Sequence, residues 1–387
     1  MKPDVHFRRV AIVQRELPHY RTPFYECLRA ELASRDVALA VIQSSASASE
    51  RLPGDIGNVP WAHTVSGSEF GIGDRRVLWQ PLIPTIKTAD LVIVEQASRL
   101  LLNYVLFARQ ALLRRPMALW GHGRSFHSEN ATTGAGESLK RWLSARVHWW
   151  FAYNDLSAKV ISELGFPVER TTVVQNSTDT RRFREMVDET SAERLYRLRE
   201  GLGLHRGRTA IFVGNFHPEK QLSFLFEAIE HLHREDPDFS LLVVGSGIEQ
   251  QLVETMAAKR TYVHYLGNRF DSDLAAAFAV ADVVLVPGWA GLVIVDAFAA
   301  RVPIVLSSTF PHPPEISYLE SGENGIVVDD GGSPKRYADR VRTLLDDADE
   351  YRRLVRGCAA AADTYSVEAM ATRFADGIVK ALSPRFT

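Results

Sequence analysis

The sequence of 387 residues lacks the features that mark several common classes of protein. Its only two cysteines, Cys27 and Cys358, provide neither a disulfide framework nor a cysteine-rich metal site, which favours a reducing compartment. No apolar run reaches the roughly 18 residues that a membrane span needs. The opening residues also lack the apolar segment of a signal peptide. The sequence therefore indicates a cytoplasmic protein.

Charge and motifs exclude further classes. A formal net charge of -2 argues against a general nucleic-acid-binding protein. The sequence contains no Walker A, His-Glu-x-x-His or Gly-x-Ser-x-Gly motif, and no complete Gly-x-Gly-x-x-Gly turn. Asp271 and Asp273 have the spacing of a metal-diphosphate motif, but they precede an apolar helical run, which favours helix capping. We expect no metal site and no cofactor.

The sequence does contain an alternation of short β-branched runs with longer helical patterns. The predicted strands are residues 9–14, 36–43, 89–96, 116–122, 147–154, 171–176, 209–215, 239–247, 261–268, 281–288, 302–308 and 325–330. Such alternation is typical of doubly wound α/β units with parallel sheets. A charged helical stretch interrupts the series at 177–208. We therefore predict Rossmann-like domains at 1–180 and 181–365, and a helix within 366–387 that packs back on the N-terminal domain.

Ligands bind such sheets outside the carboxyl ends of the strands, and three segments place suitable residues there. A glycine turn opens an apolar helix at 286–305, where the amides of 289–293 could bind a phosphate and Asp296 a ribose hydroxyl. Lys220 begins an amphipathic helix, an unfavourable place for a cation unless an anion is bound. His122 and Arg124 flank a glycine that allows close approach of a ligand.

Each segment also has a purely structural interpretation. The apolar stretch could be a core helix with a solvent-facing Asp296, Lys220 a solvated surface lysine, and His122 a structural histidine. Residues 98–150 combine Leu, Phe, Tyr and Trp with basic side chains: residues 99–148 hold eight Lys and Arg and only two acids. That pattern is typical of a surface that binds anionic lipid, and equally of a helix that solvates its basic face.

The order of these segments resembles retaining glycosyltransferases of the GT-B fold, in glycosyltransferase family 4, over nearly the full length. The segments that carry the resemblance are "PHYRTPFYECL", "LWGHGR", "GFPVERTTVVQNSTDTRRF", "FVGNFHPEKQLSFLFEAI", "LLVVGSG", "VHYLGN", "ADVVLVPG", "GLVIVDAFAARVPIV" and "ESGENGIVV". The resemblance implies an N-terminal acceptor-binding domain and a C-terminal nucleotide-sugar-binding domain that face each other across a cleft. It also implies metal-independent transfer from a nucleoside-diphosphate sugar.

The resemblance assigns roles to individual residues. Lys220 would neutralise the donor diphosphate, His122 would face the transferred sugar, and Asp296 would hold the ribose. The other implied donor-binding residues are Gly214, Asn215, Gly245, Ser246, Leu266, Gly267, Ala290, Gly291, Leu292 and Val293. The candidates for acceptor or phosphate contacts are Tyr20, Arg21, Arg124 and Asn176.

Two positions depart from the family pattern. Gly288 stands where the family has a glutamate that contacts the sugar, and Asn215 where it has an arginine beside the diphosphate. A branch of the family resembles this chain in its Pro-Gly at the glutamate position and in a downstream Pro-His-x-Pro-Glu, here Pro311 to Glu315. Loss of the glutamate is therefore interpreted as divergence.

The main functional hypothesis is a transferase of cell-surface polysaccharide or glycolipid biosynthesis. Its partners would be a nucleotide-sugar donor and a glycan or lipid-linked acceptor, with residues 98–150 on the anionic inner face of a membrane. Two alternatives stay open: transfer to a small soluble acceptor such as a secondary metabolite, and a catalytically silent nucleotide-sugar-binding protein. The donor nucleotide, the sugar, the acceptor, the linkage and the oligomeric state are left undetermined.

Overall fold

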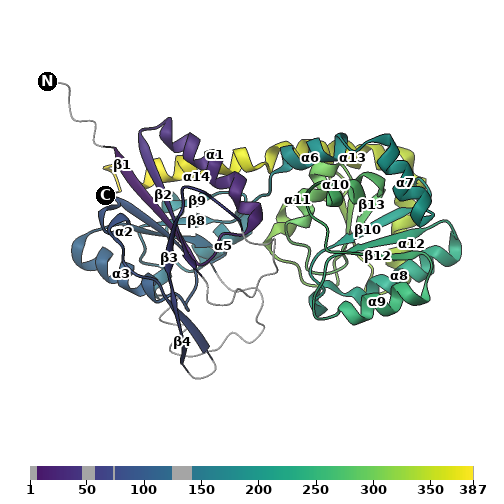
Figure 1. Ribbon diagram of the computed structural model, residues 1–387, viewed down its shortest axis with the longest axis horizontal. Helices are drawn as coiled ribbons and strands as arrows, with labels where there is room; N and C mark the ends of the chain where they lie inside the picture. Colours follow the sequence, from purple (N-terminus) through teal and green to yellow (C-terminus); the bar gives the residue numbers. More distant parts are fainter. Residues whose placement is uncertain (1–6, 46–56, 73–74, 124–141, 387) are drawn as a thin grey trace. The chain divides into compact units, whose positions relative to one another are not determined.

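The computed structural model describes residues 7–45, 57–72, 75–123 and 142–386. The chain divides into two compact units, one of Met1–Asn176 with Val367–Thr387 and the other of Ser177–Ser366. The predicted boundaries were residues 180 and 365. Both units are α/β, and each is built on a parallel sheet (Figure 1).

The N-terminal unit contains a seven-stranded parallel sheet in the order β3-β2-β1-β6-β7-β8-β9. Its strands are β1 (Arg8–Gln14), β2 (Val37–Ser45), β3 (His63–Ser66), β6 (Leu91–Glu95), β7 (Met117–Gly121), β8 (Trp149–Ala152) and β9 (Thr171–Val173). Its helices are α1 (Thr22–Ala33), α2 (Pro84–Thr88), α3 (Leu101–Leu113), α5 (Asp155–Glu163) and α14 (Val367–Ala381). An antiparallel hairpin of β4 (Ser68–Ile72) and β5 (Arg75–Trp79) extends from this unit.

The last helix of the chain completes the core of the N-terminal unit. Met370, Phe374 and Ile378 recur every four residues along α14 and are fully buried, as a helix with one apolar face requires. Phe374 stacks on Phe151 of β8 with 4.2 Å between ring centroids. α14 lies beside α1 on one face of the sheet, although more than 330 residues separate the two helices in the sequence (Figure 1).

The C-terminal unit contains a six-stranded parallel sheet in the order β12-β11-β10-β13-β14-β15, which is the order of a Rossmann fold. Its strands are β10 (Thr209–Val213), β11 (Ser240–Val244), β12 (Val263–Gly267), β13 (Val283–Leu285), β14 (Ile304–Ser307) and β15 (Gly325–Val328). Its helices are α6 (Thr180–Asp188), α7 (Ala192–Leu202), α8 (Leu222–Glu235), α9 (Gln250–Lys259), α10 (Asp271–Val280), α11 (Val293–Ala300), α12 (Pro334–Asp346) and α13 (Ala348–Thr364).

The helices of the C-terminal unit lie on both faces of its sheet. α8 packs against α12 on one face, and α11 packs against α6 and α13 on the other (Figure 1). The strands between them are almost completely buried, which explains why they consist of Val, Ile, Leu and Phe without alternation.

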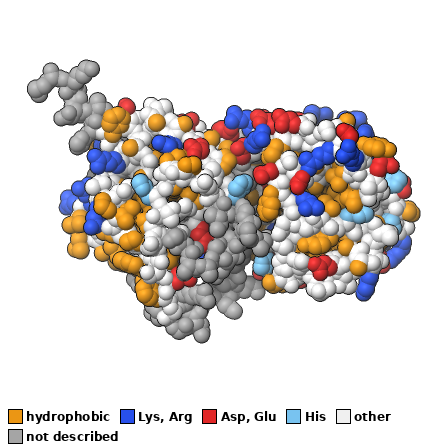
Figure 2. Space-filling model, in the orientation of Figure 1, with side chains coloured by type: hydrophobic (Ala, Val, Ile, Leu, Met, Phe, Trp, Pro, Cys, Tyr) orange, Lys and Arg blue, Asp and Glu red, His pale blue; other side chains and the backbone are white. Residues whose placement is uncertain are grey.

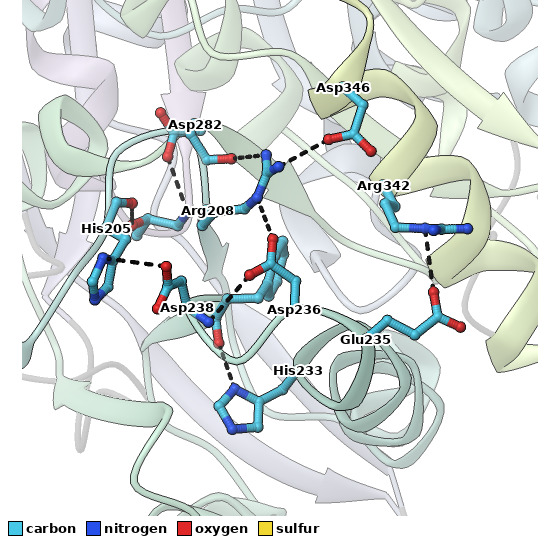
Figure 3. Close-up of polar contacts among 12 residues, drawn as sticks. His205, Arg208, His233, Glu235, Asp236, Asp238, Asp282, Arg342 and Asp346 are labelled. Atoms are coloured by element: carbon cyan, nitrogen blue, oxygen red, sulfur yellow. Dashed lines mark hydrogen bonds and ion pairs between the residues drawn. The ribbon is translucent and has the colours of Figure 1, made fainter.

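A polar network holds the amino ends of strands in the C-terminal unit (Figure 3). Arg208, just before β10, forms ion pairs with Asp236 and Asp346, the latter at 2.9 Å. The carboxylate of Asp282, just before β13, accepts a hydrogen bond from the Thr209 amide at 2.9 Å. These contacts lie at the edge of the sheet opposite to the carboxyl ends of the strands, so they stabilise the fold without entering the candidate site.

Candidate functional site

The strand order predicts a ligand-binding crevice between β10 and β13. In both sheets the order reverses beside the first strand, next to β6 in the N-terminal unit and next to β13 in the C-terminal unit. Open α/β sheets bind ligands at such switch points, outside the carboxyl ends of the strands. The loops that follow β10 and β13 carry Lys220 and Trp289, respectively.

Lys220 bridges these two loops. It does not begin α8, as the sequence suggested, but ends a 3-10 turn (Pro218–Lys220) two residues before that helix. Its Nζ donates to the Trp289 carbonyl at 2.6 Å and would lie 3.4 Å from a Cβ on Gly214. Burial lowers the pKa of the ammonium to about 8, while the charges of Glu219 and Glu315 act in the opposite direction. A half-buried lysine whose pKa lies near neutrality is a strong candidate for anion binding.

The turn before α11 is conformationally strained. Trp289 has φ 43°, in the left-handed region that bulky residues rarely adopt. Gly288 precedes it, and a Cβ at that position would lie 2.3 Å from the Glu219 carbonyl oxygen. The backbone of the Lys220 loop therefore fills the space that a side chain at position 288 would need. Any residue other than glycine at position 288 would therefore require this backbone to move.

The start of α11 presents unpaired amides. α11 begins at Val293, within the predicted segment 286–305. The amides of Gly291, Leu292 and Val293 have no acceptor among the residues that the structure describes. The Ala290 amide differs, because it faces the Nδ1 of His312 at 3.4 Å. The Trp289 amide donates to the Pro311 carbonyl at 3.2 Å. Three of the five amides of residues 289–293 are therefore available at a helix N-terminus, where anions are favoured.

His312 and Glu315 belong to this site, although the sequence assigned them no role. The Nε2 of His312 donates to the Ser307 carbonyl at 2.8 Å, so Nδ1 is the acceptor that faces Ala290. Burial lowers the pKa of His312, the bond to Ser307 opposes this, and the charge of Lys220 lowers it further. Glu315 is 6% exposed and close enough to interact with Lys220. The only signal in the sequence was their Pro-His-x-Pro-Glu spacing.

Asp296 lies in the first turn of α11 and contacts the segment that begins the C-terminal unit. Its Oδ1 accepts a hydrogen bond from Thr178 Oγ1 at 2.9 Å. Burial raises the pKa of Asp296 to about 6, and the Thr178 hydrogen bond opposes that shift. When it is ionised, this half-buried carboxylate can accept a hydrogen bond from a hydroxyl group. Thr178 is a contact that spacing in the sequence did not indicate.

The other implied donor-binding residues lie in three adjacent loops at the same edge of the sheet. The loop 214–216 follows β10, the loop 245–247 follows β11, and Leu266 and Gly267 end β12. Backbone hydrogen bonds join the loops. The Phe216 amide donates to the Ser246 carbonyl at 2.8 Å, and the Gly245 amide donates to the Gly267 carbonyl at 3.0 Å. A Cβ on Gly245 would lie 2.0 Å from the Gly214 carbonyl oxygen, so this glycine permits the close approach of two loops.

In the N-terminal unit, Tyr153 connects the candidate residues. Its ring lies edge-on to His122 with 4.2 Å between centroids, and the Arg21 guanidinium carbon lies 5.4 Å from it. Arg21 also lies 5.3 Å from the ring of Tyr20, and the Asn176 amide donates to the Tyr153 carbonyl at 2.7 Å. Four segments of the chain thus meet at one edge of the sheet. Only its place at a predicted strand end distinguished Tyr153 in the sequence.

Arg21 is the most unusual residue of this cluster. Its side chain is only 3% exposed, it stacks on Trp120 at 4.3 Å, and it has no carboxylate partner among the residues that the structure describes. Most buried charges in proteins are paired, so Arg21 remains a candidate for binding an anion. Arg124, the other candidate cation, lies outside the described residues.

The described part of the 98–150 surface is amphipathic only in places. Leu112 and Leu113 are 80% and 67% exposed and precede the exposed Arg114 and Arg115. Hydrophobic and basic side chains intermix over α2 and α3 on the face in Figure 2. Arg109 instead points inward, where its Nη2 donates to the Lys87 carbonyl at 2.8 Å.

A largely apolar pocket lies beside α3. It is lined by Gln96, Tyr104, Phe107, Leu119, Leu143 and Val147, among others. Gln96 also donates to the Gly123 carbonyl at 2.8 Å, which places one end of the pocket beside the His122 loop.

Among the described residues, no helix is long and apolar enough to cross a membrane, and no group of three His, Cys, Asp or Glu side chains could hold a metal ion.

Comparison with known proteins finds a family match in the C-terminal unit. Residues 207–347, which include Lys220 and Asp296, match the family model for glycosyl transferases group 1. The chain is 30% identical to a D-inositol 3-phosphate glycosyltransferase of Corynebacterium glutamicum over 186 residues, or 45% of this chain and 43% of that protein. It is 31% identical over 159 residues to a phosphatidyl-myo-inositol mannosyltransferase of Mycobacterium leprae, or 40% and 42%. These matches span less than half the length of the curated relatives.

Solved structures match the whole chain in fold. HepE of Anabaena, crystallised with UDP, aligns over 96% of this chain and 99% of its own with a TM-score of 0.69 and 19% identity. WaaG, a glycosyltransferase involved in lipopolysaccharide biosynthesis, aligns over 95% and 98% with a TM-score of 0.61 and 16% identity. The chain thus has the GT-B fold, and its residues 207–347 are similar to glycosyl transferases group 1.

Proposed function

We propose that the protein is a retaining, metal-independent glycosyltransferase that moves a sugar from a nucleoside-diphosphate sugar to an acceptor. The observation that carries this proposal is the position of Lys220, a half-buried cation bonded to the loop that leads to three unpaired amides, at the switch point of a Rossmann sheet. A diphosphate would satisfy both groups at once. The family match of the same segment supports it, as does UDP in a structure of the same fold.

The chemistry follows from where charge develops. Departure of a nucleoside diphosphate leaves negative charge on phosphate, which Lys220 and the amides of Gly291, Leu292 and Val293 would stabilise. Asp296 would hold the ribose, and His122 would face the transferred sugar. We name no catalytic base, because the leaving phosphate itself can accept the proton of the acceptor hydroxyl. Asn215 stands where the family has an arginine, and Arg21 or Arg124 would supply the missing positive charge.

We infer a glycolipid or another lipid-linked glycan as the acceptor. Two relatives are named for inositol-containing acceptors, one of them a phosphatidylinositol. The apolar pocket that begins at Gln96 and the exposed Leu112 and Leu113 next to arginines would suit an amphiphile at an anionic surface. In this account the protein works in the cytoplasm at the inner face of the membrane. Flotation with anionic liposomes tests this inference: a protein that acts on a lipid-linked acceptor should float with the liposomes, and one that acts on a small soluble acceptor should not.

Activity is tested by release of nucleoside diphosphate from UDP-, GDP-, ADP- and TDP-sugars, with and without extracted membrane lipid. We expect one donor to turn over, with Lys220→Ala lowering turnover by orders of magnitude and EDTA having no effect. The anomeric configuration of the product, read by NMR, tests retention. Near-wild-type turnover in Lys220→Ala would remove Lys220 from the mechanism. Unchanged donor affinity in Arg21→Ala and Arg124→Ala would dismiss both arginines.

A catalytically silent nucleotide-sugar-binding protein is the second candidate. Gly288 and Asn215 favour it, because each lacks a side chain that the family uses on the donor, and the structure leaves no room for one at position 288. Donor binding without hydrolysis or transfer in any lipid extract would select this function.

A further inference from the structure

His122 bonds to a serine in a way that determines where its proton lies. The His122 Nδ1 is 3.1 Å from the Oγ of Ser157, in the first turn of α5. Either group could donate across this distance, since a hydroxyl and a neutral imidazole nitrogen can each donate or accept. The direction is therefore set by the other partners of the Ser157 hydroxyl.

Asn154 decides that direction. It caps α5, and its Oδ1 accepts a hydrogen bond from the Ser157 amide at 3.0 Å. A flipped side-chain amide would bring two N–H donors together, so the oxygen must face Ser157. The same Oδ1 lies 2.9 Å from Ser157 Oγ, and two oxygens at that distance need a hydrogen between them. The single hydroxyl proton of Ser157 therefore points to Asn154.

We propose that Asn154 and Ser157 are positioning residues that hold His122 with its proton on Nδ1. Because the Ser157 hydroxyl has given its proton to Asn154, it can only accept from His122 Nδ1. Both positioning side chains are 0% exposed, so water does not compete for these bonds. The edge-on ring of Tyr153 fixes the plane of the imidazole. Neutral His122 then presents Nε2 as an acceptor.

This arrangement chooses between roles that the sequence left open. A histidine with Nε2 as an acceptor receives a hydrogen bond from a hydroxyl, whereas it cannot donate one to a phosphate oxygen. This step rests on the proposed function. The group that donates to His122 Nε2 is then a hydroxyl of the transferred sugar, and His122 selects donors that carry this hydroxyl. Capping alone would not need the serine hydroxyl, because the Ser157 amide already occupies Asn154.

The tautomer is measured directly on the full chain by long-range nitrogen–proton NMR at pH 8, with labelled histidine. His122→Gln identifies the signals of His122. We expect the wild type to carry the proton on Nδ1, and Ser157→Ala to shift it toward Nε2. His312 provides an internal control, because its Nε2 donates to Ser307 and must show the opposite tautomer in both proteins. A wild-type His122 with its proton on Nε2 would overturn the proposal.

A kinetic comparison tests the role of the hydroxyl. Ser157→Ala should lower turnover of the parent donor about three- to tenfold, the loss of one neutral hydrogen bond, and should not affect a deoxy donor that lacks the hydroxyl. Equal losses with both donors would overturn the selector role. If no donor is turned over while the NMR spectrum shows the expected tautomer, the proposed function fails and the Asn154–Ser157–His122 arrangement stands.

Discussion

The burial of Lys220 predicts that donor binding weakens above pH 8. The pKa of its ammonium is about 8, compared with 10.5 for an unperturbed lysine. Only the charged form attracts a diphosphate strongly, and the apparent Kd varies inversely with the fraction of protein in the binding-competent form. That fraction falls about tenfold between pH 7 and pH 9, and so the apparent Kd should rise about tenfold.

Isothermal titration calorimetry with the nucleoside diphosphate of the preferred donor measures this effect. Binding should take up close to one proton per site at pH 9 and about a tenth of a proton at pH 7. Lys220→Arg is the matched control, because its guanidinium stays charged over the whole range and should remove the pH dependence. A wild-type Kd that is constant between pH 7 and pH 9.5 would refute the reasoning. So would an equal pH dependence in Lys220→Arg.

The lowered pKa of Lys220 also determines how the free energy of unfolding changes with pH. The folded pKa of Lys220 lies below its unfolded value, so between pH 8 and 10.5 the unfolded chain binds more protons. The contribution of Lys220 to the free energy of unfolding therefore rises with pH over this interval, by up to about 3 kcal/mol. The difference in free energy of unfolding between wild type and Lys220→Met, measured in urea at pH 7 and pH 10, isolates this contribution.

Three further predictions concern stability. The Asp296 pKa of about 6 lies above its unfolded value of 3.8, so ionisation destabilises the fold as pH rises. Asp296→Asn should raise the free energy of unfolding by about 3 kcal/mol at pH 8 and about half as much at pH 5, measured in urea; equal effects would contradict this. Gly288→Ala should destabilise the chain by about 1–3 kcal/mol and weaken donor binding, while Gly291→Ala, with open space around it, should do neither. Gly377→Ala places a Cβ 2.4 Å from Thr172 Oγ1 and should lower the unfolding midpoint, whereas Gly201→Ala in α7 should raise it slightly; the reverse order would be inconsistent with this packing.

The fold was largely predictable because its strands are buried on both faces. Each of the twelve predicted strands overlaps an observed one, since parallel sheets covered by helices need continuous apolar runs. β3, β4 and β5 were missed because they form an edge strand and a hairpin without such runs. Some predicted strands were too long because the loop residues next to them are also apolar or aromatic. For example, a strand was predicted at residues 147–154, and β8 is Trp149–Ala152.

The site was less predictable because its contacts join distant segments. Lys220 and Trp289 are 69 residues apart, and Thr178 and Asp296 are 118 apart, so no local pattern could reveal either bond. The left-handed backbone of Trp289 has no sequence signal either, because tryptophan rarely adopts it. Spacing and resemblance could name Lys220 and Asp296 as candidates. Only coordinates could show that burial moves the pKa of both toward neutrality.

The most direct test of the central claim is thermal unfolding of the wild type and of Lys220→Ala with UDP-, GDP-, ADP- and TDP-sugars and the free nucleotides. A ligand that binds only the folded chain raises the midpoint by mass action. We predict that one sugar nucleotide raises the wild-type midpoint clearly and that Lys220→Ala loses this shift. The absence of a shift with every nucleotide, or an equal shift in both proteins, would contradict a donor site built on Lys220.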